Sequence, residues 1–143
     1  MSTLTKPHQT YEKPGIVLAY DLGTDTIYKG ALVGLTTAGR TAPLSPEDPM
    51  RFLGVSDENA DPAGPARRFT VAKLGTFVFG CAPGFHPTSC DLGRVVYAAT
   101  DWQVTVAPNG LAHATPVGTI VAIERLEEER AFGVRIRIDL YTV

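Results

Sequence analysis

The sequence predicts a mainly β protein, either a small antiparallel β-barrel or a β-sandwich, with an extended N-terminal arm and long loops. Short segments rich in β-branched and aromatic residues recur between turns, as expected for strands. The 143 residues include 11 prolines and 14 glycines, a share typical of loop-rich β proteins. Residues 133–140 alternate strictly between apolar and polar side chains. This places Arg135, Arg137 and Asp139 on one strand face and aliphatic residues on the other.

The chain is expected to fold as one domain that follows an arm. Residues 1–15 contain Pro7, Pro14 and Gly15 among polar residues and have no hydrophobic periodicity, so they are predicted to form the arm. Residues 16–143 form a single predicted β domain, because this length suits one hydrophobic core.

Strands are predicted at intervals along this domain, each bounded by turn-forming residues. They cover residues 16–20, 27–35, 51–56, 68–79, 94–98, 103–106, 117–123 and 133–140. Gly30 and Gly34 suggest bulges in the second strand, and Gly75 suggests a bend in the fourth. The predicted loops are residues 43–49, 57–65 and 80–93, the last with room for one short helical turn, and residues 125–130 form a charged hairpin tip or short helix.

Charge and hydropathy bound the possible partners. The formal net charge is −2 and only 20% of residues are charged, so the chain has no global basic field that would attract nucleic acid. No apolar run approaches the roughly 18–20 residues of a membrane span, and the N-terminus lacks the apolar core of a signal peptide. We therefore expect a soluble protein made in the cytoplasm, without a nucleic-acid or membrane partner.

A series of short strands with glycines between them carries a family resemblance. The segments are GRVVYA at 93–98, DWQVT at 101–105, PVGTI at 116–120 and VRIRI at 134–138, preceded by RFLGVS at 51–56 and VAKLGTFVF at 71–79. Together they resemble the small β-rich capsid cement, or head decoration, proteins of tailed bacteriophages. The resemblance covers about residues 27–141, and residues 1–26 lie outside it.

The resemblance implies a structural protein of the virion exterior. Such a protein binds the outer surface of the expanded capsid and clamps adjacent major capsid subunits, with no catalytic motif and no cofactor. It also implies a homo-oligomer, for which a trimer is the first expectation and a monomer or dimer the alternative. A trimer would cover apolar surface such as that around Phe77, Phe79 and Trp102.

Candidate partner-binding residues lie in the arm and on the last strand. They are Lys6, Pro7, Tyr11 and Lys13 in the arm, and Arg135 and Arg137 on the strand. The arm, with Tyr11 as an anchor, is suited to adding a strand to the sheet edge of a neighbour. The two arginines either meet an acidic partner or face solvent, and the sequence leaves both interpretations open.

One segment imitates a nucleotide site. Residues 16–26 combine a hydrophobic strand with an Asp-Leu-Gly-Thr turn, which resembles the phosphate-binding turn of actin-like ATPases. That fold needs two large lobes and further phosphate motifs, for which 143 residues without a helical half are insufficient. An ordinary turn is the favoured interpretation.

A second segment imitates a thiol active site. His86, Cys90 and Asp91 lie within one loop, but nucleophilic catalysis also needs an oriented base and oxyanion donors, for which there is no signature. Cys81 and Cys90 are expected to be reduced thiols and not a disulfide or half of a zinc site. The chain is therefore not predicted to be an enzyme. The alternatives to a cement protein are another virion β-module (a tail or head-completion protein, or a carbohydrate-binding knob) and, least favoured, a small thiol hydrolase.

Overall fold

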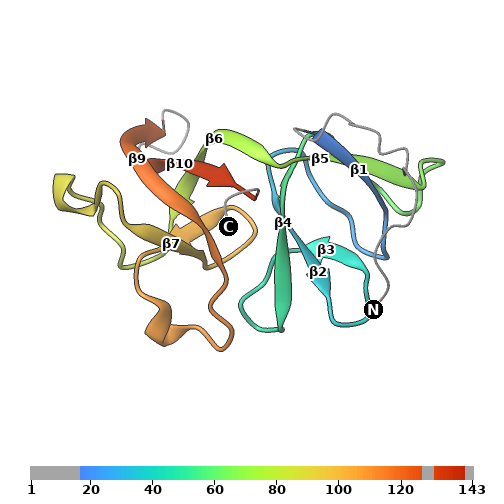
Figure 1. The fold of residues 1–143 in the computed structure, drawn as a ribbon, viewed down its shortest axis with the longest axis horizontal. Coiled ribbons are helices and arrows are strands. Elements are labelled where there is room, and N and C mark those ends of the chain that lie inside the picture. The colour runs from blue at the N-terminus through green and yellow to red at the C-terminus, as the bar shows by residue number, and fades with distance from the viewer. Residues whose placement is uncertain (1–16, 127–130, 141–143) are drawn as a thin grey trace, which may run out of the picture.

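The N-terminal half of the domain forms an open antiparallel sheet. The computed structural model describes residues 17–126 and 131–140, so the predicted arm lies outside the described residues. The strands of this sheet are β1 (Val17–Asp21), β2 (Leu32–Thr36), β3 (Thr41–Pro43), β4 (Met50–Ser56) and β5 (Arg68–Ala72). Their spatial order is β1-β5-β4-β2-β3, and we call this unit the first sheet (Figure 1).

The C-terminal half forms a closed five-stranded barrel. Its strands are β6 (Leu74–Cys81), β7 (Val95–Ala98), β8 (Gln103–Thr105), β9 (Pro116–Leu126) and β10 (Ala131–Asp139), in the order β10-β6-β8-β7-β9. Single 3₁₀ turns occur at Ser89–Asp91 and Pro108–Gly110. The predicted mainly β fold is confirmed, with a barrel beside a separate sheet. One pair, β6 with β8, is parallel, whereas a wholly antiparallel arrangement was expected.

The centre of the first sheet, at β2, is buried on both faces. Leu32, Leu44 and Val55 belong to the same core cluster as the interior of the barrel. Val33 and Val71 belong to a second cluster on the opposite face of the first sheet. Because both faces are covered, β2 is an apolar run without period-two alternation. The two halves of the chain therefore share one of their cores.

The two halves are also joined by polar contacts. The backbone N–H of Leu32 donates to the carbonyl of Asp101 at 2.7 Å, and the N–H of His113 donates to the carbonyl of Pro46 at 2.8 Å. Lys73 stands between β5 and β6, at the passage from one half to the other. These contacts fix the barrel against β2 and the β3–β4 loop.

Lys73 is a buried lysine, with 7% of its surface exposed. Its ammonium group donates to the hydroxyl of Tyr20 at 2.8 Å and to the carbonyl of Leu53. The same nitrogen lies 5.0 Å from the centre of the Tyr20 ring, within cation–π range. One side chain thus ties β1 and β4 to the point where the chain enters the barrel.

A threonine hydroxyl brings the two edge strands of the first sheet together. The hydroxyl of Thr41 in β3 donates to the carbonyl of Asp21 in β1 at 2.9 Å and accepts from the N–H of Gly23 at 3.1 Å. A Cβ atom on Gly23 would lie 2.4 Å from the carbonyl oxygen of Thr41, so only glycine permits this approach. The sheet is curled until its edges meet at one end.

The second predicted strand is shorter than expected. Residues 27–35 were predicted as one strand, but Ile27 forms only an isolated bridge with Ala60, and β2 begins at Leu32. Between them the N–H of Ala31 donates to the carbonyl of Tyr28, and Gly30 has a φ of 89°, which closes a tight turn. Gly30 is a turn residue and not a bulge.

The long predicted strand at 68–79 is two strands. It ends at Ala72 as β5, which pairs with β1 and β4, and resumes at Leu74 as β6, which pairs with β10 and β8. The break is at Lys73, two positions before the predicted bend. The predicted loop at 43–49 also begins late, because residues 41–43 form β3. The short helical turn predicted within 80–93 is present as Ser89–Asp91.

Candidate interaction surface

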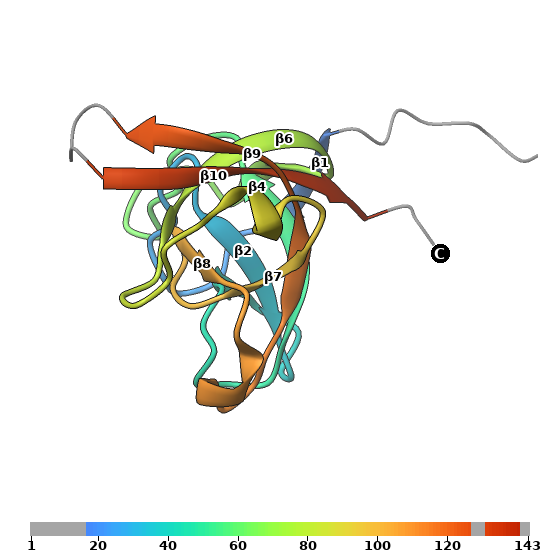
Figure 2. The ribbon, with the colours of Figure 1, turned by 90° about the vertical axis from the view of Figure 1, so that its left-hand side faces the viewer.

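The outer face of the barrel carries the two arginines that the sequence singled out. Along β10, Val134, Ile136 and Ile138 are buried, whereas Arg135 and Arg137 are exposed. The predicted alternation of this strand is therefore confirmed. Figure 2 shows β9 and β10 running side by side across the top of the barrel, with β6 next to them.

Both arginines have acidic partners on the same face. A guanidinium nitrogen of Arg135 lies 2.5 Å from a carboxylate oxygen of Glu124, which is diagonally placed on β9. A guanidinium nitrogen of Arg137 lies 3.7 Å from a carboxylate oxygen of Asp139 on the same strand. Such exposed pairs contribute at most about 1 kcal/mol each to folding. Since their charges are locally balanced, this surface is not a basic patch.

Apolar side chains surround these ion pairs. Val78 on β6 stands opposite Arg135 in the register of β10 and β6, and its surface is 44% exposed. Val121 on β9 is also 44% exposed, and Trp102 just before β8 is 43% exposed. We call these residues, namely Val78, Trp102, Val121, Arg135 and Arg137, the barrel face.

Trp102 is held against the barrel by a glycine. A Cβ atom on Gly80 of β6 would lie 2.6 Å from the Trp102 ring, so the indole packs directly on the backbone of β6. The N–H of Gly80 donates to the carbonyl of Trp102 at 3.0 Å. The indole is therefore a positioned aromatic group on a strand, which is the kind of anchor that protein interfaces use.

The apolar surface predicted for a trimer included Phe79, and the structure shows that Phe79 is not on the surface. Phe79 is 3% exposed and belongs to the barrel core, and Phe77 is half-buried against that core. Odd-numbered residues of β6 point inward because successive side chains alternate between the faces of a strand. Of the three aromatic residues named, Trp102 is the exposed one.

Asp91 serves the fold of the loop after β6. Its carboxylate accepts from the N–H of Thr88 at 2.8 Å and from the guanidinium of Arg94 at 3.1 Å. The backbone donor at Thr88, together with the Arg94 guanidinium, holds the pKa of Asp91 below its usual value. The carboxylate caps the 3₁₀ turn at Ser89–Asp91 and does not orient His86.

The two cysteines lie in different surroundings, and neither thiol is hydrogen-bonded to a base among the described residues. Both cysteines are free, with Cys81 half-buried and Cys90 exposed, as the sequence led us to expect. Cys81 and His86 line a hollow of about 490 Å³, but burial raises the pKa of the Cys81 thiol and so disfavours the thiolate. Among the described residues, no hydrogen bond joins His86 to either thiol.

The segment that imitates a phosphate site closes the first sheet. The carboxylate of Asp21 lies 3.4 Å from the Nε atom of Arg68, and the Gly23 backbone contacts Thr41. Thr24 and Asp25 are exposed. These contacts give Asp21 and Gly23 structural roles in the closure of the sheet.

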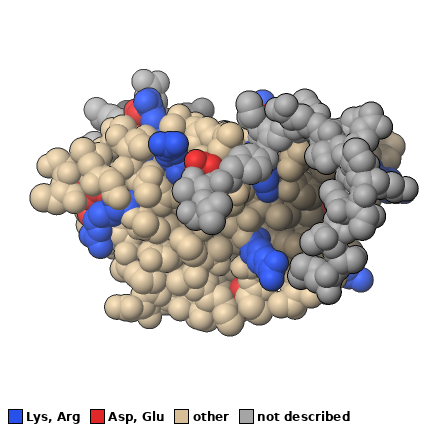
Figure 3. All heavy atoms as spheres, viewed as in Figure 1, with Lys and Arg blue, Asp and Glu red and all other residues tan. Residues whose placement is uncertain are grey.

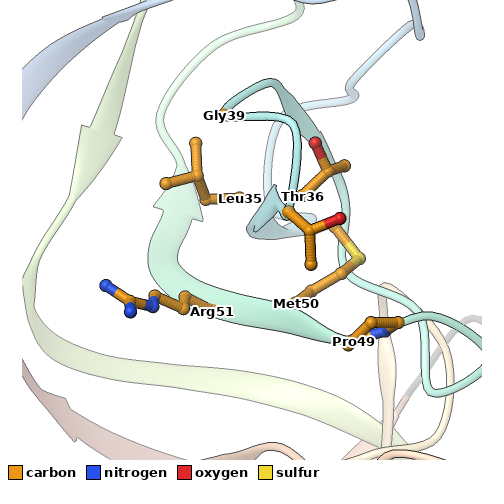
Figure 4. A pocket seen from close by; sticks show the side chains of 7 residues that line it. Leu35, Thr36, Gly39, Pro49, Met50 and Arg51 are labelled. Carbon is orange, nitrogen blue, oxygen red and sulfur yellow. The ribbon is translucent and has the colours of Figure 1, made fainter.

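A hollow that the sequence did not indicate lies on the first sheet. It has a volume of about 450 Å³ and lies between the β2–β3 hairpin and the start of β4 (Figure 4). We call it the hairpin hollow, and it is lined by Leu35, Thr36, Thr37, Gly39, Pro49, Met50 and Arg51. Its residues come from separate stretches of sequence, so no local sequence motif predicts it.

The arm candidates Lys6, Pro7, Tyr11 and Lys13 lie outside the described residues. Within residues 17–126 and 131–140, no cluster of three or more His, Cys, Asp or Glu side chains could hold a metal ion. The helices that the structure describes are too short and too polar to cross a membrane. Comparison with known proteins found no matching family model, no similar curated protein and no similar solved structure.

Proposed function

We propose that this chain is a structural virion protein of the cement type. It binds the outer surface of the expanded phage capsid and clamps adjacent major capsid subunits. The resemblance of residues 27–141 to such proteins suggests this function. The single observation that carries the proposal is the barrel face, where a fixed indole and exposed valines surround balanced ion pairs.

The composition of the barrel face suits a protein partner. Interface centres are enriched in aromatic residues and arginine, and their polar groups are paired. Trp102, Arg135 and Arg137 have this character, and closed β pairing fixes their positions without a further ordering cost. The closed barrel holds these residues on a rigid surface, which is suited to binding a lattice of protein subunits.

The stabilising mechanism is mass action. A protein that binds the assembled lattice, but not its loosened form, shifts the equilibrium toward the lattice in proportion to its occupancy. Contacts with several subunits at once raise the effective affinity further. The same binding would place the protein on the exterior of the virion.

Trimerisation is the first expectation for the oligomeric state. Native mass spectrometry should then give three times the 15.3 kDa of the chain. A monomer at micromolar concentration would contradict trimerisation in solution and leave assembly on the capsid to be tested by co-sedimentation.

The arm is proposed as a second contact with the partner. Deleting residues 1–15 should leave the fold intact, because every strand described lies after residue 16. The deletion should weaken binding to the partner, since Lys6, Pro7, Tyr11 and Lys13 are lost. An unchanged affinity in the truncated protein would contradict this role.

Co-sedimentation with phage heads tests the proposed function. The purified chain is mixed with heads from its own system, before and after expansion, and the bound fraction is measured against concentration. Saturable binding to expanded heads alone would support a cement protein. Absence of binding to both forms would contradict the proposal and favour the other virion modules.

A further inference from the structure

The hairpin hollow combines an apolar lining with hydroxyl groups and a cation. β2 and β4 pair here, with Leu35 opposite Arg51 and Thr36 opposite Met50. Figure 4 shows Leu35 and Arg51 extending from one side of the strands, with Met50 rising beside Thr36. Pro49 completes the apolar lining. A suitable occupant must therefore offer an apolar group next to an acceptor of hydrogen bonds.

Arg51 and Arg40 differ from the arginines that form ion pairs on other surfaces of the described chain. Arg94 and Arg135 each form an ion pair with a carboxylate on their own surface. Arg51 and Arg40 form no ion pair with a described residue, and both are exposed. Figure 3 shows cationic groups in the middle of this face among largely uncharged surface, with a smaller acidic patch close to them. Arg51, which lines the hollow without an ion pair to a described residue, is therefore available to an acidic partner.

Arg40 stands at the same hairpin as the hollow. Its carbonyl accepts from the N–H of Thr36 at 2.8 Å, and its N–H donates to the hydroxyl of Thr36 at 3.1 Å. Glu47 and Asp48 lie in the neighbouring β3–β4 loop, and no ion pair joins either of them to Arg40 or Arg51. The backbone of Arg40 is thus fixed beside Thr36, which lines the hollow together with Arg51.

The edge of β4 favours an extended occupant. β4 pairs with β2 along its length, but on its other side it pairs with β5 only at Val55 and Ser56. The Leu53 carbonyl is occupied by Lys73, and Gly54 lies against Ala72 of β5. Among the described strands, residues 50–52 therefore pair with β2 alone. Extended segments are commonly recognised beside such edges, with specificity supplied by side-chain pockets.

We propose that the hairpin hollow binds an extended acidic segment of the protein partner, with an apolar side chain in the hollow and carboxylates on Arg40 and Arg51. Guanidinium–carboxylate contacts supply the strongest hydrogen bonds available to such a site. The proposal rests on the proposed function for the identity of the partner, which would be the major capsid protein. The chemistry of the hollow is tested without the capsid.

A peptide assay tests the chemistry directly. The probe is a short fluorescein-labelled peptide of alternating glutamate and leucine, and its control replaces glutamate by glutamine. We expect the fluorescence anisotropy of the glutamate peptide to rise to saturation as protein is added. The affinity for the glutamine peptide should be lower by about tenfold or more. Arg51→Glu and Arg40→Glu should each reduce binding of the glutamate peptide by about tenfold or more.

Lys29→Glu is the matched control. It makes the same change of charge at an exposed turn outside the hollow, and it should bind the peptide as the unmodified chain does. Thermal unfolding checks that each variant folds. If Arg51→Glu does not fold, the binding of Arg40→Glu tests the role of the arginines in its place. Equal binding of the two peptides, or full binding by both arginine variants, would overturn the proposal.

Co-sedimentation separates this proposal from the proposed function. If the unmodified chain binds expanded heads and Arg51→Glu binds them equally well, the hollow is not the capsid contact, although the protein remains a cement protein. If the unmodified chain does not bind heads, the proposed function fails, while the peptide assay still decides the chemistry of the hollow. An oligomer that Arg51→Glu dissociates would identify a second copy as the occupant and overturn the assignment to a capsid partner.

Discussion

The two halves of this chain close their sheets in different ways. The barrel is closed by backbone pairing from β10 through β6, β8, β7 and β9, whereas the edges of the first sheet meet through the hydroxyl of Thr41. The first sheet also depends on Lys73 and on the core that it shares with the barrel. Backbone closure tolerates change on the outer face, but closure through side chains depends on single residues.

This difference has a consequence for function. The outer face of the barrel can vary in sequence while the strands keep their positions, so it is free to specialise for a partner. Residues of the first sheet are constrained on both faces by the two cores. The end of the sheet around the β2–β3 hairpin is more exposed, since Thr37, Gly39 and Arg51 of the hairpin hollow are exposed there.

The largest effect is expected where the two cores meet the first sheet. Leu32→Ala should lower the free energy of unfolding by about 2–5 kcal/mol, because it opens a cavity in a fully buried position between the halves. Val121→Ala on the barrel face should change it by less than about 0.5 kcal/mol. Urea unfolding followed by circular dichroism measures the free energy of unfolding of both variants. Similar losses in the two variants would contradict the expected difference between the first sheet and the outer face of the barrel.

A slightly smaller loss is expected for the buried lysine. Lys73→Met should cost about 1.5–3 kcal/mol of unfolding free energy, since it removes hydrogen bonds from a charged donor to Tyr20 and Leu53. The exposed Lys29→Met is the control and should be nearly neutral. A neutral result for Lys73→Met would mean that its polar contacts do not outweigh the gain from burying an apolar side chain.

The hydroxyl that closes the first sheet should contribute less again. Thr41→Val keeps the shape of the side chain but leaves the Asp21 carbonyl and the Gly23 N–H without this partner, at a cost of about 1–3 kcal/mol. Amide hydrogen exchange should then accelerate in β1 and β3 more than in the barrel. Uniform exchange across both halves would show that the edges do not open separately.

The smallest effect concerns the pH dependence of the barrel half. The pKa of Asp91 is lower in the folded chain than its ordinary value, so its contribution to stability is present above that ordinary value. The contribution is lost as the pH falls through the folded pKa. Asp91→Asn should therefore lose less stability than the unmodified chain as the pH falls from about 5 to about 2. Identical slopes in urea unfolding across this range would contradict the role of Asp91.

Local patterns predicted the barrel better than the first sheet. The alternation around Arg135 and Arg137 reports one buried and one exposed face, and this is what β10 has. The first sheet lacks such alternation because Leu32 and Val33 are both buried, on opposite faces. An apolar run of this kind is compatible with several structures, so its bounds were predicted less well.

The contacts that close the first sheet depend on distant parts of the chain. The break at Lys73 follows from the pairing of β5 and β6 with different partners, and Thr41 closes the sheet through residues about 20 positions away. The hairpin hollow likewise joins Leu35 with Arg51 across two strands. Residue types alone did not indicate these sites, because each becomes visible only when strand pairing is known.

The most direct test of the proposed capsid contact replaces Trp102, the anchor of the barrel face. Trp102→Ala is compared with the unmodified chain in saturation binding to expanded heads, with circular dichroism and urea unfolding confirming that the variant folds. If the barrel face binds the capsid, loss of this fixed indole should weaken binding by about tenfold or more, as for a central interface residue. Equal binding by a folded Trp102→Ala variant would contradict the assignment of the barrel face as the capsid-binding surface.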